Sequence, residues 1–378
     1  MNLEYRVPSL IPGEELIIPE EHRLPPRDDG FLSSSPWQLM GYDYELTLKG
    51  NPITDGNDKY YRNKMEYSLF WSHEDEKIHL AFHLRRSYRK FPIKNSVLER
   101  PEIFARAKEI VDDLNARGEE ARKYQSILLR CNQKGQVEGG LFEKGQPHPT
   151  FNNLTDTILG HEYSYSPNGF FQINLPVYEM ALKEIAKHIQ TDKVLDLYAG
   201  VGTIGLSVAR DHQLTLVETN PAAYAELEKN CLGQVNEGSF SGLAEATAER
   251  ERANPVTTSP WDEEGRRPTG VSDATRGRAL RNTPRAVLSN SEDALDFITP
   301  DTTVILDPPR AGCHPKLLEK LLQELPPTII YLSCNPSTQA RDLKILAKKY
   351  QATLTQPYNF FPRTPHLENL VVLQPKRV

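Results

Sequence analysis

The chain has 378 residues, 38% hydrophobic and 25% charged, which is the composition of an ordinary globular protein with room for two or three domains. Its formal net charge of -6 excludes a uniformly basic nucleic-acid coat but allows a basic patch on one face. No run reaches the roughly 20 apolar residues of a membrane-spanning helix, and the first residues lack the apolar core of a signal peptide. We therefore expect a cytoplasmic protein without membrane contacts.

The cysteines predict neither a metal site nor a disulfide framework. Cys131, Cys231, Cys313 and Cys334 are far apart and form no C-x-x-C pair, which zinc sites and iron–sulfur clusters usually need. Disulfide frameworks belong mainly to small secreted domains. We expect a monomer with no metal or iron–sulfur cluster.

The first 160 residues predict an arm followed by a small domain. Residues 1–56 are rich in proline, glycine and acidic residues, which indicates an extended arm with short strands. Two alternating runs, 61–71 and 78–84, are joined by a polar turn and predict two paired strands. A helix is expected over 101–123, with further strands at 126–131 and 139–142. These elements indicate a central α+β domain over residues 57–160.

A basic segment lies inside this central domain. Its sequence, Arg85-Arg86-Ser87-Tyr88-Arg89-Lys90-Phe91, places positive charges between aromatic rings. Such a pattern suits phosphate neutralisation combined with base stacking. A solvated charged surface with no ligand explains the segment equally well, and both interpretations remain open.

Residues 161–378 predict a second, larger domain. An aromatic-rich segment, 163–174, is followed by strands and helices in alternation, as in a doubly wound α/β fold. Residues 233–284 interrupt that alternation, because they are rich in Ser, Thr, Glu, Arg, Gly and Pro and contain few apolar residues. We expect this segment to be a flexible insertion between two strands.

A glycine turn indicates a cofactor site. Gly200, Gly202 and Gly205 follow a predicted strand and match G-x-G-x-x-G. Glu218 ends the next strand, where a carboxylate accepts ribose hydroxyl groups of NAD or of another adenosine cofactor. Asp196, just before the glycines, would repel a pyrophosphate but would suit a cationic amino group. S-adenosylmethionine satisfies both acids.

Three further strand boundaries carry reactive groups. Asp307 ends an apolar run and is followed by two stiffening prolines. Cys334 ends another run before Asn-Pro, where helix-terminal N–H groups would lower the thiol pKa, although a buried core cysteine is the plain alternative. Glu368 precedes a core strand, and partial burial would raise its pKa towards that of a useful base.

Together these motifs resemble the RNA uracil-C5 methyltransferases, which make 5-methyluridine in tRNA or rRNA. The resemblance runs from about residue 60 to the C-terminus without the insertion. Its motifs are Tyr61-Arg62-Asn63-Lys64-Met65-Glu66, Phe170-Phe171-Gln172-Ile173-Asn174, Asp196-Leu197-Tyr198-Ala199-Gly200-Val201-Gly202, Asp307-Pro308-Pro309-Arg310, Ser333-Cys334-Asn335-Pro336 and Pro365-His366-Leu367-Glu368.

The resemblance implies a Rossmann-like class I methyltransferase domain over residues 161–378, with a mixed, mostly parallel sheet, and a smaller N-terminal β-rich RNA-binding domain. It implies S-adenosylmethionine as cofactor and 23S rRNA or tRNA as partner, with the target base flipped out of its stack. Cys334 would attack C6 of uracil and Glu368 would remove the C5 proton. The implied cofactor-binding residues are Gln172, Tyr198, Gly200, Gly202, Thr203, Glu218 and Asp307.

The chain departs from the family pattern in three places. Thr203 stands where many members have Asn, the N-terminal arm does not match the small RNA-binding β-barrel of some members, and cluster cysteines are absent. Two other functions remain open. A NAD-dependent oxidoreductase would use the glycine turn but would leave Cys334 and Glu368 without roles. A non-catalytic RNA-binding protein on a methyltransferase fold would account for Thr203 and the insertion.

Overall fold

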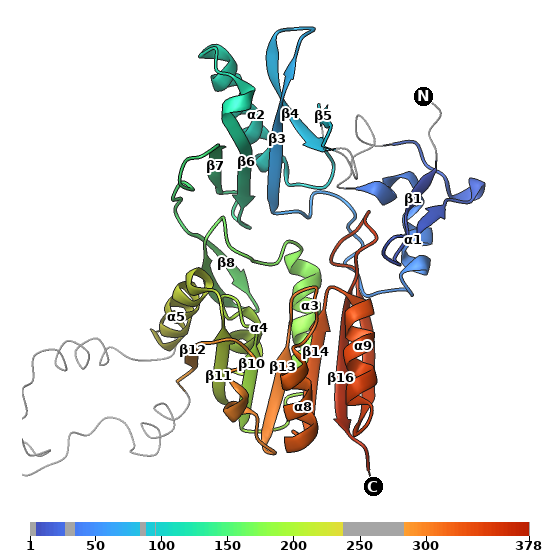
Figure 1. The fold of residues 1–378 in the computed structure, drawn as a ribbon, viewed down its shortest axis with the longest axis vertical. Helices are drawn as coiled ribbons and strands as arrows, with labels where there is room; N and C mark the ends of the chain where they lie inside the picture. Colours follow the sequence, from blue (N-terminus) through green and yellow to red (C-terminus); the bar gives the residue numbers. More distant parts are fainter. Residues whose placement is uncertain (1–4, 27–34, 84–87, 95, 237–282, 378) are drawn as a thin grey trace, which may run out of the picture.

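The computed structural model describes residues 5–26, 35–83, 88–94, 96–236 and 283–377. Residues 85–87 of the basic segment and 237–282 of the expected insertion lie outside the described residues. Among the helices that are described, none is long and apolar enough to cross a membrane. Figure 1 shows two lobes and a small N-terminal unit, with the larger lobe formed by the C-terminal half of the chain.

A seven-stranded sheet forms the larger lobe, in the order β12-β11-β10-β13-β14-β16-β15. The strands are β10 (Lys193–Leu197), β11 (Gln213–Glu218), β12 (Arg285–Leu288), β13 (Thr302–Leu306), β14 (Thr328–Ser333), β15 (Tyr350–Tyr358) and β16 (Glu368–Pro375). Strands β10 to β14 pair in parallel, whereas β16 runs antiparallel to both of its neighbours. The predicted α/β fold with a mixed, mostly parallel sheet is confirmed.

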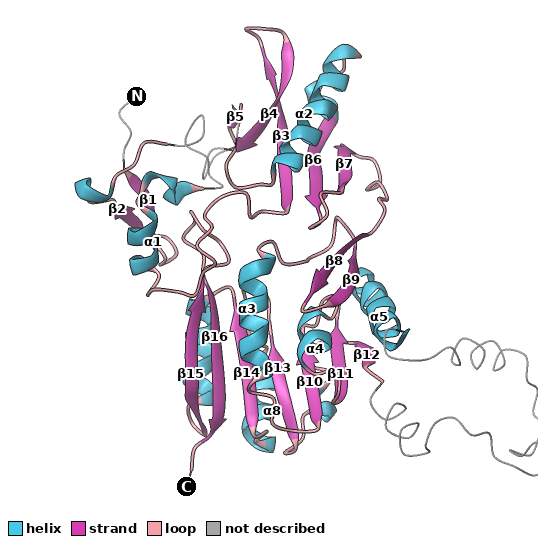
Figure 2. Cartoon of the chain, turned by 180° about the vertical axis from the view of Figure 1, so that it is seen from behind, coloured by secondary structure: helices cyan, strands magenta, loops and turns pink. Residues whose placement is uncertain are grey.

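Helices cover both faces of this sheet (Figure 2). On one face lie α3 (Leu175–Ala186), α4 (Thr203–Val208) and α5 (Pro221–Asn236), and on the other α8 (Pro315–Glu324) and α9 (Pro336–Leu346). Neighbouring strand residues divide between the two cores, since Ile330 packs towards α3 while Ile329 and Tyr331 pack towards α8 and α9. A strand buried on both faces must be apolar throughout, which explains the continuous apolar runs in the sequence.

The smaller lobe is an antiparallel sheet in the order β5-β4-β3-β6-β7, packed against α2 (Pro101–Ala116). Its strands are β3 (Lys64–Ser72), β4 (Lys77–His83), β5 (Lys90–Pro92), β6 (Tyr124–Cys131) and β7 (Val137–Glu143). The predicted helix over 101–123 ends earlier, at Ala116, because Gly118 takes up a left-handed conformation with φ of +65°. A separate hairpin, β8 (Leu154–Ile158) and β9 (His161–Tyr165), lies beside α5 and belongs to the core of the larger lobe.

The N-terminal segment is more structured than an extended arm. It contains β1 (Arg6–Pro8), β2 (Glu15–Ile17), two 3-10 turns (Glu20–His22 and Pro36–Leu39) and α1 (Tyr42–Leu48). Val7, Ile18, Trp37, Leu39 and Met40 are buried together in a small core of their own. The Trp37 indole donates to the Pro8 carbonyl at 2.7 Å, which joins the two ends of this unit.

Replacing Trp37 by alanine tests how far this unit contributes to stability. Trp37 is 1% exposed, so Trp37→Ala should lower the free energy of unfolding by about 3–5 kcal/mol. Chemical denaturation followed by circular dichroism measures the loss. Trp71 is 39% exposed, and Trp71→Ala should change stability by no more than about 0.5 kcal/mol. Equal effects of the two substitutions would contradict the packing described above.

Candidate active site

The reactive side chains follow from the register of the central strands. Leu197 on β10 pairs with Val217 on β11 and with Leu306 on β13, so Tyr198, Glu218 and Asp307 come next to one another at the carboxyl ends of these strands. This edge is where ligands bind in open α/β sheets. We call Tyr198, Glu218, Asp307, Cys334 and Glu368 the strand-end cluster.

The antiparallel pairing of β14 with β16 adds the last two members. Ser333 is opposite Asn369, and one step further along the same register brings Cys334 opposite Glu368. Asn335 then caps α9, because its side chain accepts the Ser337 N–H at 3.2 Å and donates to the Arg310 carbonyl at 2.9 Å. The thiol and the carboxyl group are therefore neighbours, although 34 positions separate them in the chain.

Cys334 is a partly exposed residue, whereas Cys131, Cys231 and Cys313 are buried. Burial raises the pKa of the Cys334 thiol to about 11, the charges of Glu368 and Asp307 add to this rise, and Arg310 opposes it. The lowering that we expected from the helix terminus is therefore outweighed in the free protein. Arg310 is the nearby positive group that favours the thiolate.

Two carboxyl groups near Cys334 hold protons more tightly than usual. Burial raises the pKa of Glu368 well above its ordinary value, the charge of Asp307 raises it further, and Arg310 lowers it. The Glu368 Oε2 atom is buried without a hydrogen-bond partner among the described residues. Burial also raises the pKa of Asp307 to about 7. A buried carboxyl group with an unused oxygen is well suited to accept a proton from a bound molecule.

The glycine turn is hydrogen-bonded directly to the Glu218 side chain. Glu218 is 8% exposed, and its carboxylate accepts the Gly200 N–H at 2.8 Å and the Asn220 N–H at 2.7 Å. Gly200 has φ of +57°, and no described atom lies within 4 Å of the position that a Cβ would occupy. Gly202, with φ of +90°, has no such room, since a Cβ would lie 2.6 Å from Leu227. The turn therefore leaves open backbone at Gly200 beside a carboxylate.

Asp196 has a structural contact that the sequence did not indicate. The side chain is fully buried, and its Oδ2 accepts the Gly205 N–H at 2.8 Å. One oxygen thus points back towards α4, whereas Oδ1 is buried without a hydrogen-bond partner among the described residues. Gly205 permits the approach of Oδ2, because a Cβ there would lie 2.8 Å from that oxygen. Burial raises the pKa of Asp196 to about 7.

Hydrogen bonds hold three other predicted residues, namely Thr203, Tyr198 and Gln172. Thr203 begins α4, and its hydroxyl shares a 2.8 Å hydrogen bond with Tyr178 of α3. Tyr198 has φ of +66° and accepts a hydrogen bond from Ser291 at 2.8 Å. Gln172 is buried in the loop before α3, and its backbone carbonyl accepts the Asn63 side chain at 2.9 Å. Gln172 therefore lies where the two lobes meet.

Sequence reasoning missed Arg310 and Ser291 as members of the site. Arg310 had a signal, because it directly follows the Asp-Pro-Pro segment that ends β13. Ser291 had none, since its contact with Tyr198 depends on the loop after β12.

Comparisons with known proteins agree with this architecture. Residues 295–376 match the family model of tRNA (Uracil-5-)-methyltransferase. An RNA methyltransferase of Bacillus cereus is 31% identical over 225 residues, which is 58% of this chain and 40% of the relative. One from Enterococcus faecalis is 26% identical over 370 residues, 84% of this chain and 71% of the relative. The chain thus spans about two fifths of the length of the first of these relatives.

A solved structure shows the same fold over nearly the whole chain. The tRNA (uracil-54, C5)-methyltransferase of Pyrococcus abyssi, in complex with S-adenosyl-L-homocysteine, superposes with a TM-score of 0.68 at 19% identity. The match covers 96% of this chain and 88% of that structure. The resemblance seen in the motifs is confirmed by these matches.

Arg310→Gln tests the charge beside Cys334. Removing the guanidinium should raise the pKa of the Cys334 thiol further and slow its alkylation by iodoacetamide at pH 9 by about threefold to tenfold. Mass spectrometry of digested protein measures the rate. Cys313, 4% exposed and with a pKa raised to about 12, is an internal control whose slow labelling should not change. An unchanged or faster rate at Cys334 would contradict the assignment.

Asp307→Asn tests the raised pKa of the Asp307 carboxyl group through stability. The folded protein retains the Asp307 proton up to about pH 7, whereas the unfolded chain loses it near pH 4, so wild-type stability falls as the pH rises between these values. Asp307→Asn removes this loss and should stabilise the protein at pH 8 by on the order of 1–3 kcal/mol, with little difference at pH 4.

Asp301→Asn is the matched control for this substitution. Asp301 is exposed at the opposite end of β13, and its hydrogen bond with Lys193 lowers its pKa. Denaturant titrations at pH 4 and pH 8 should show no gain in stability for Asp301→Asn. A loss of stability at pH 8 in Asp307→Asn would refute the raised pKa.

Proposed function

We propose that this chain, which resembles the RNA uracil-C5 methyltransferases, transfers a methyl group from S-adenosylmethionine to C5 of uracil in RNA through a covalent Cys334–C6 adduct. One observation carries the proposal: the β14–β16 register brings the partly exposed Cys334 opposite Glu368, whose Oε2 has no hydrogen-bond partner among the described residues. The reaction needs a nucleophile and a base on neighbouring positions of one ring, and these two side chains meet that requirement.

The glycine turn and Glu218 fit an adenosine cofactor. The Glu218 carboxylate has lone pairs left for ribose hydroxyl groups after accepting two backbone N–H groups, and open space at Gly200 lets a ligand approach the backbone. Tyr198, Gly202, Thr203, Asp307 and Gln172 complete the proposed binding set. When bound, S-adenosylmethionine supplies an electrophilic methyl group at the edge of the sheet where Cys334 and Glu368 lie.

The residues of the cluster divide the chemistry between them. Cys334 gives up its proton to solvent, favoured by Arg310, and its sulfur adds to C6 while the electrons of the C5–C6 double bond move towards C5. C5 would then be nucleophilic enough to take the methyl group, with the demethylated cofactor as leaving group. Glu368 then accepts the C5 proton, the C–H electrons restore the C5–C6 double bond, and the C6–S bond breaks to return the thiolate. The raised pKa of Glu368 makes it a stronger base in this step than an ordinary carboxylate.

The sheet topology favours this function over a NAD-dependent oxidoreductase. Dinucleotide-binding sheets of the doubly wound type are built from parallel strands, whereas here the antiparallel β16 lies between β14 and β15. That strand is also the one that delivers Glu368. A non-catalytic RNA-binding protein would have no need of a thiol and an unpartnered carboxyl oxygen side by side.

We propose tRNA as the first substrate class to test. The matching family model is described as a tRNA methyltransferase family, and the P. abyssi enzyme of the same fold acts on tRNA according to its name. The sequence resemblance also allows 23S rRNA, so both RNAs belong in the assay.

RNA containing 5-fluorouridine should trap the chain covalently. Fluorine at C5 cannot be removed as a proton by Glu368, so the adduct formed by Cys334 persists once methyl transfer has occurred. We expect a band of protein–RNA adduct in denaturing gels for wild type with S-adenosylmethionine and none for Cys334→Ala.

Cys313→Ala is the matched control, since Cys313 is a buried cysteine of the same lobe, and it should still form the adduct. An adduct in Cys334→Ala would refute Cys334 as the nucleophile. Wild-type protein that binds NAD tightly and S-adenosylmethionine not at all, by calorimetry, would refute the proposed function itself.

A further inference from the structure

The loop that leads into Glu368 is held by the N-terminal segment. This loop, residues 359–367, connects β15 to β16, and Glu368 is the first residue of β16. The Ile53 N–H donates to the Pro357 carbonyl at 2.9 Å, and the Asn359 N–H donates to the Ile53 carbonyl at 2.8 Å. The backbone of Ile53, more than 300 positions earlier in the sequence, is therefore hydrogen-bonded to the chain on both sides of Tyr358, where the loop begins.

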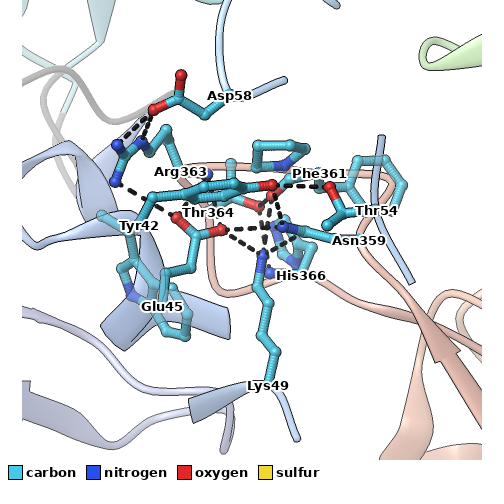
Figure 3. A network of polar contacts seen from close by, with 12 residues as sticks. Tyr42, Glu45, Lys49, Thr54, Asp58, Asn359, Phe361, Arg363, Thr364 and His366 are labelled. Atoms are coloured by element: carbon cyan, nitrogen blue, oxygen red, sulfur yellow. Dashed lines mark hydrogen bonds and ion pairs between the residues drawn. The ribbon is translucent and has the colours of Figure 1, made fainter. Parts of the chain in front are cut away.

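Within the loop, Arg363 makes several hydrogen bonds to the N-terminal segment. Its N–H donates to both carboxylate oxygens of Glu45, at 3.0 and 3.1 Å, and its carbonyl accepts the Trp37 N–H at 3.0 Å. Its guanidinium donates to the Met40 carbonyl at 2.8 Å. The same guanidinium forms an ion pair with Asp58 (Figure 3). Thus the N–H, carbonyl and guanidinium of Arg363 all bind residues of the N-terminal segment.

Arg363 also has a backbone conformation that needs such support. Its φ of +65° lies in the left-handed region, which a residue with a long side chain adopts rarely and at some cost. The direction of the Arg363 N–H depends on this φ angle, and Glu45 accepts that N–H. The conformation of the loop is therefore fixed by a side chain of α1.

Lys49 completes a buried network of balanced charge. Its ammonium group donates to Glu45 at 2.8 Å, to the Asn359 side chain at 2.7 Å and to the Phe361 carbonyl at 3.1 Å. Glu45 and Arg363 are almost completely buried as well. Buried ions are tolerated when each is paired and hydrogen-bonded. A different loop geometry would leave buried charges without partners, so the network stabilises this one geometry.

We propose that Glu45, Lys49, Asp58 and Arg363 are positioning residues that hold the loop so that Glu368 reaches the C5 proton. The inference rests on the proposed function and extends it to the N-terminal segment. Cys334 has support that does not involve the loop, through the hydrogen bonds of Asn335 and the parallel pairing of β14 with β13. Loosening the loop should therefore affect proton removal by Glu368 and leave the addition of Cys334 to C6 largely unchanged.

This separation has a kinetic signature. After methyl transfer, release requires that the C5 proton pass to Glu368, that the C–H electrons form the C5–C6 double bond and that the C6–S bond break. If Glu368 is misplaced, the methylated adduct forms but breaks down slowly, so protein bound covalently to ordinary uridine RNA accumulates. A network that only stabilises the fold would not change the rate of adduct breakdown relative to the rate of adduct formation.

The test compares Asp58→Asn with wild type, because Arg363→Ala removes a buried ion-pair partner and risks unfolding. Asp58 has a side chain that is 17% exposed, so the milder change should leave the fold intact. A misplacement of about 1 Å costs roughly a hundredfold in rate, and we expect breakdown of the adduct to slow by about tenfold for partial loosening. Rapid-quench assays with ordinary uridine RNA measure adduct formation and breakdown separately.

Asp301→Asn is the control, since it makes the same chemical change in an ion pair at the far end of the sheet. It should behave as wild type. Hydrogen exchange should show faster exchange at the amides of 361–368 in Asp58→Asn alone. Wild-type turnover with unchanged adduct breakdown in a folded Asp58→Asn would overturn this inference, whereas a wild-type chain that forms no 5-methyluridine would overturn the proposed function.

Discussion

The antiparallel pairing of β16 with β14 is the interaction on which the proposed site depends. If β16 were parallel, like the other strands of the sheet, its first residue would lie at the opposite edge from Cys334. Because it runs in reverse, its beginning meets the end of β14, and Glu368 faces Cys334 across one step of the register. The Asn369 side-chain N–H donates a hydrogen bond of 2.7 Å to the side-chain oxygen of Gln339, which ties this position to α9, the helix that follows Cys334.

Burial gives the cluster its chemical character. Burial is the main cause of the raised pKa values of Asp307, Cys334 and Glu368, and the nearby Arg310 is the positive group that offsets the negative charges around Cys334. Burial thus favours the protonated forms of Glu368 and of the Cys334 thiol in the free protein. In the proposed reaction both groups act in their ionised forms.

The sequence predicts the components of this site better than their arrangement. Glu218, Asp307 and Cys334 end apolar runs, and parallel strands bring such ends together, so their proximity follows from the pattern alone. The pairing of β16 with β14 does not, because alternation identifies a strand without its partner or direction. The contact of Asp196 with Gly205 does not follow from the pattern either, because a carboxylate before a glycine turn can point outward or back to the helix.

The N-terminal segment shows the same limit. Helix α1 has only seven residues and no side-chain cap, so it lacks the usual helix signals. Its contact with Arg363 joins positions far apart in the chain, which no local pattern predicts.

The most direct test of the account is the mapping of 5-methyluridine by mass spectrometry in tRNA and rRNA from cells that lack this protein. Cells that regain the wild-type chain should recover the modification at a defined uridine, and cells given Glu368→Gln should not. If the modification pattern is the same with and without the protein, or if Glu368→Gln restores it fully, the proposed chemistry at the β14–β16 edge is contradicted.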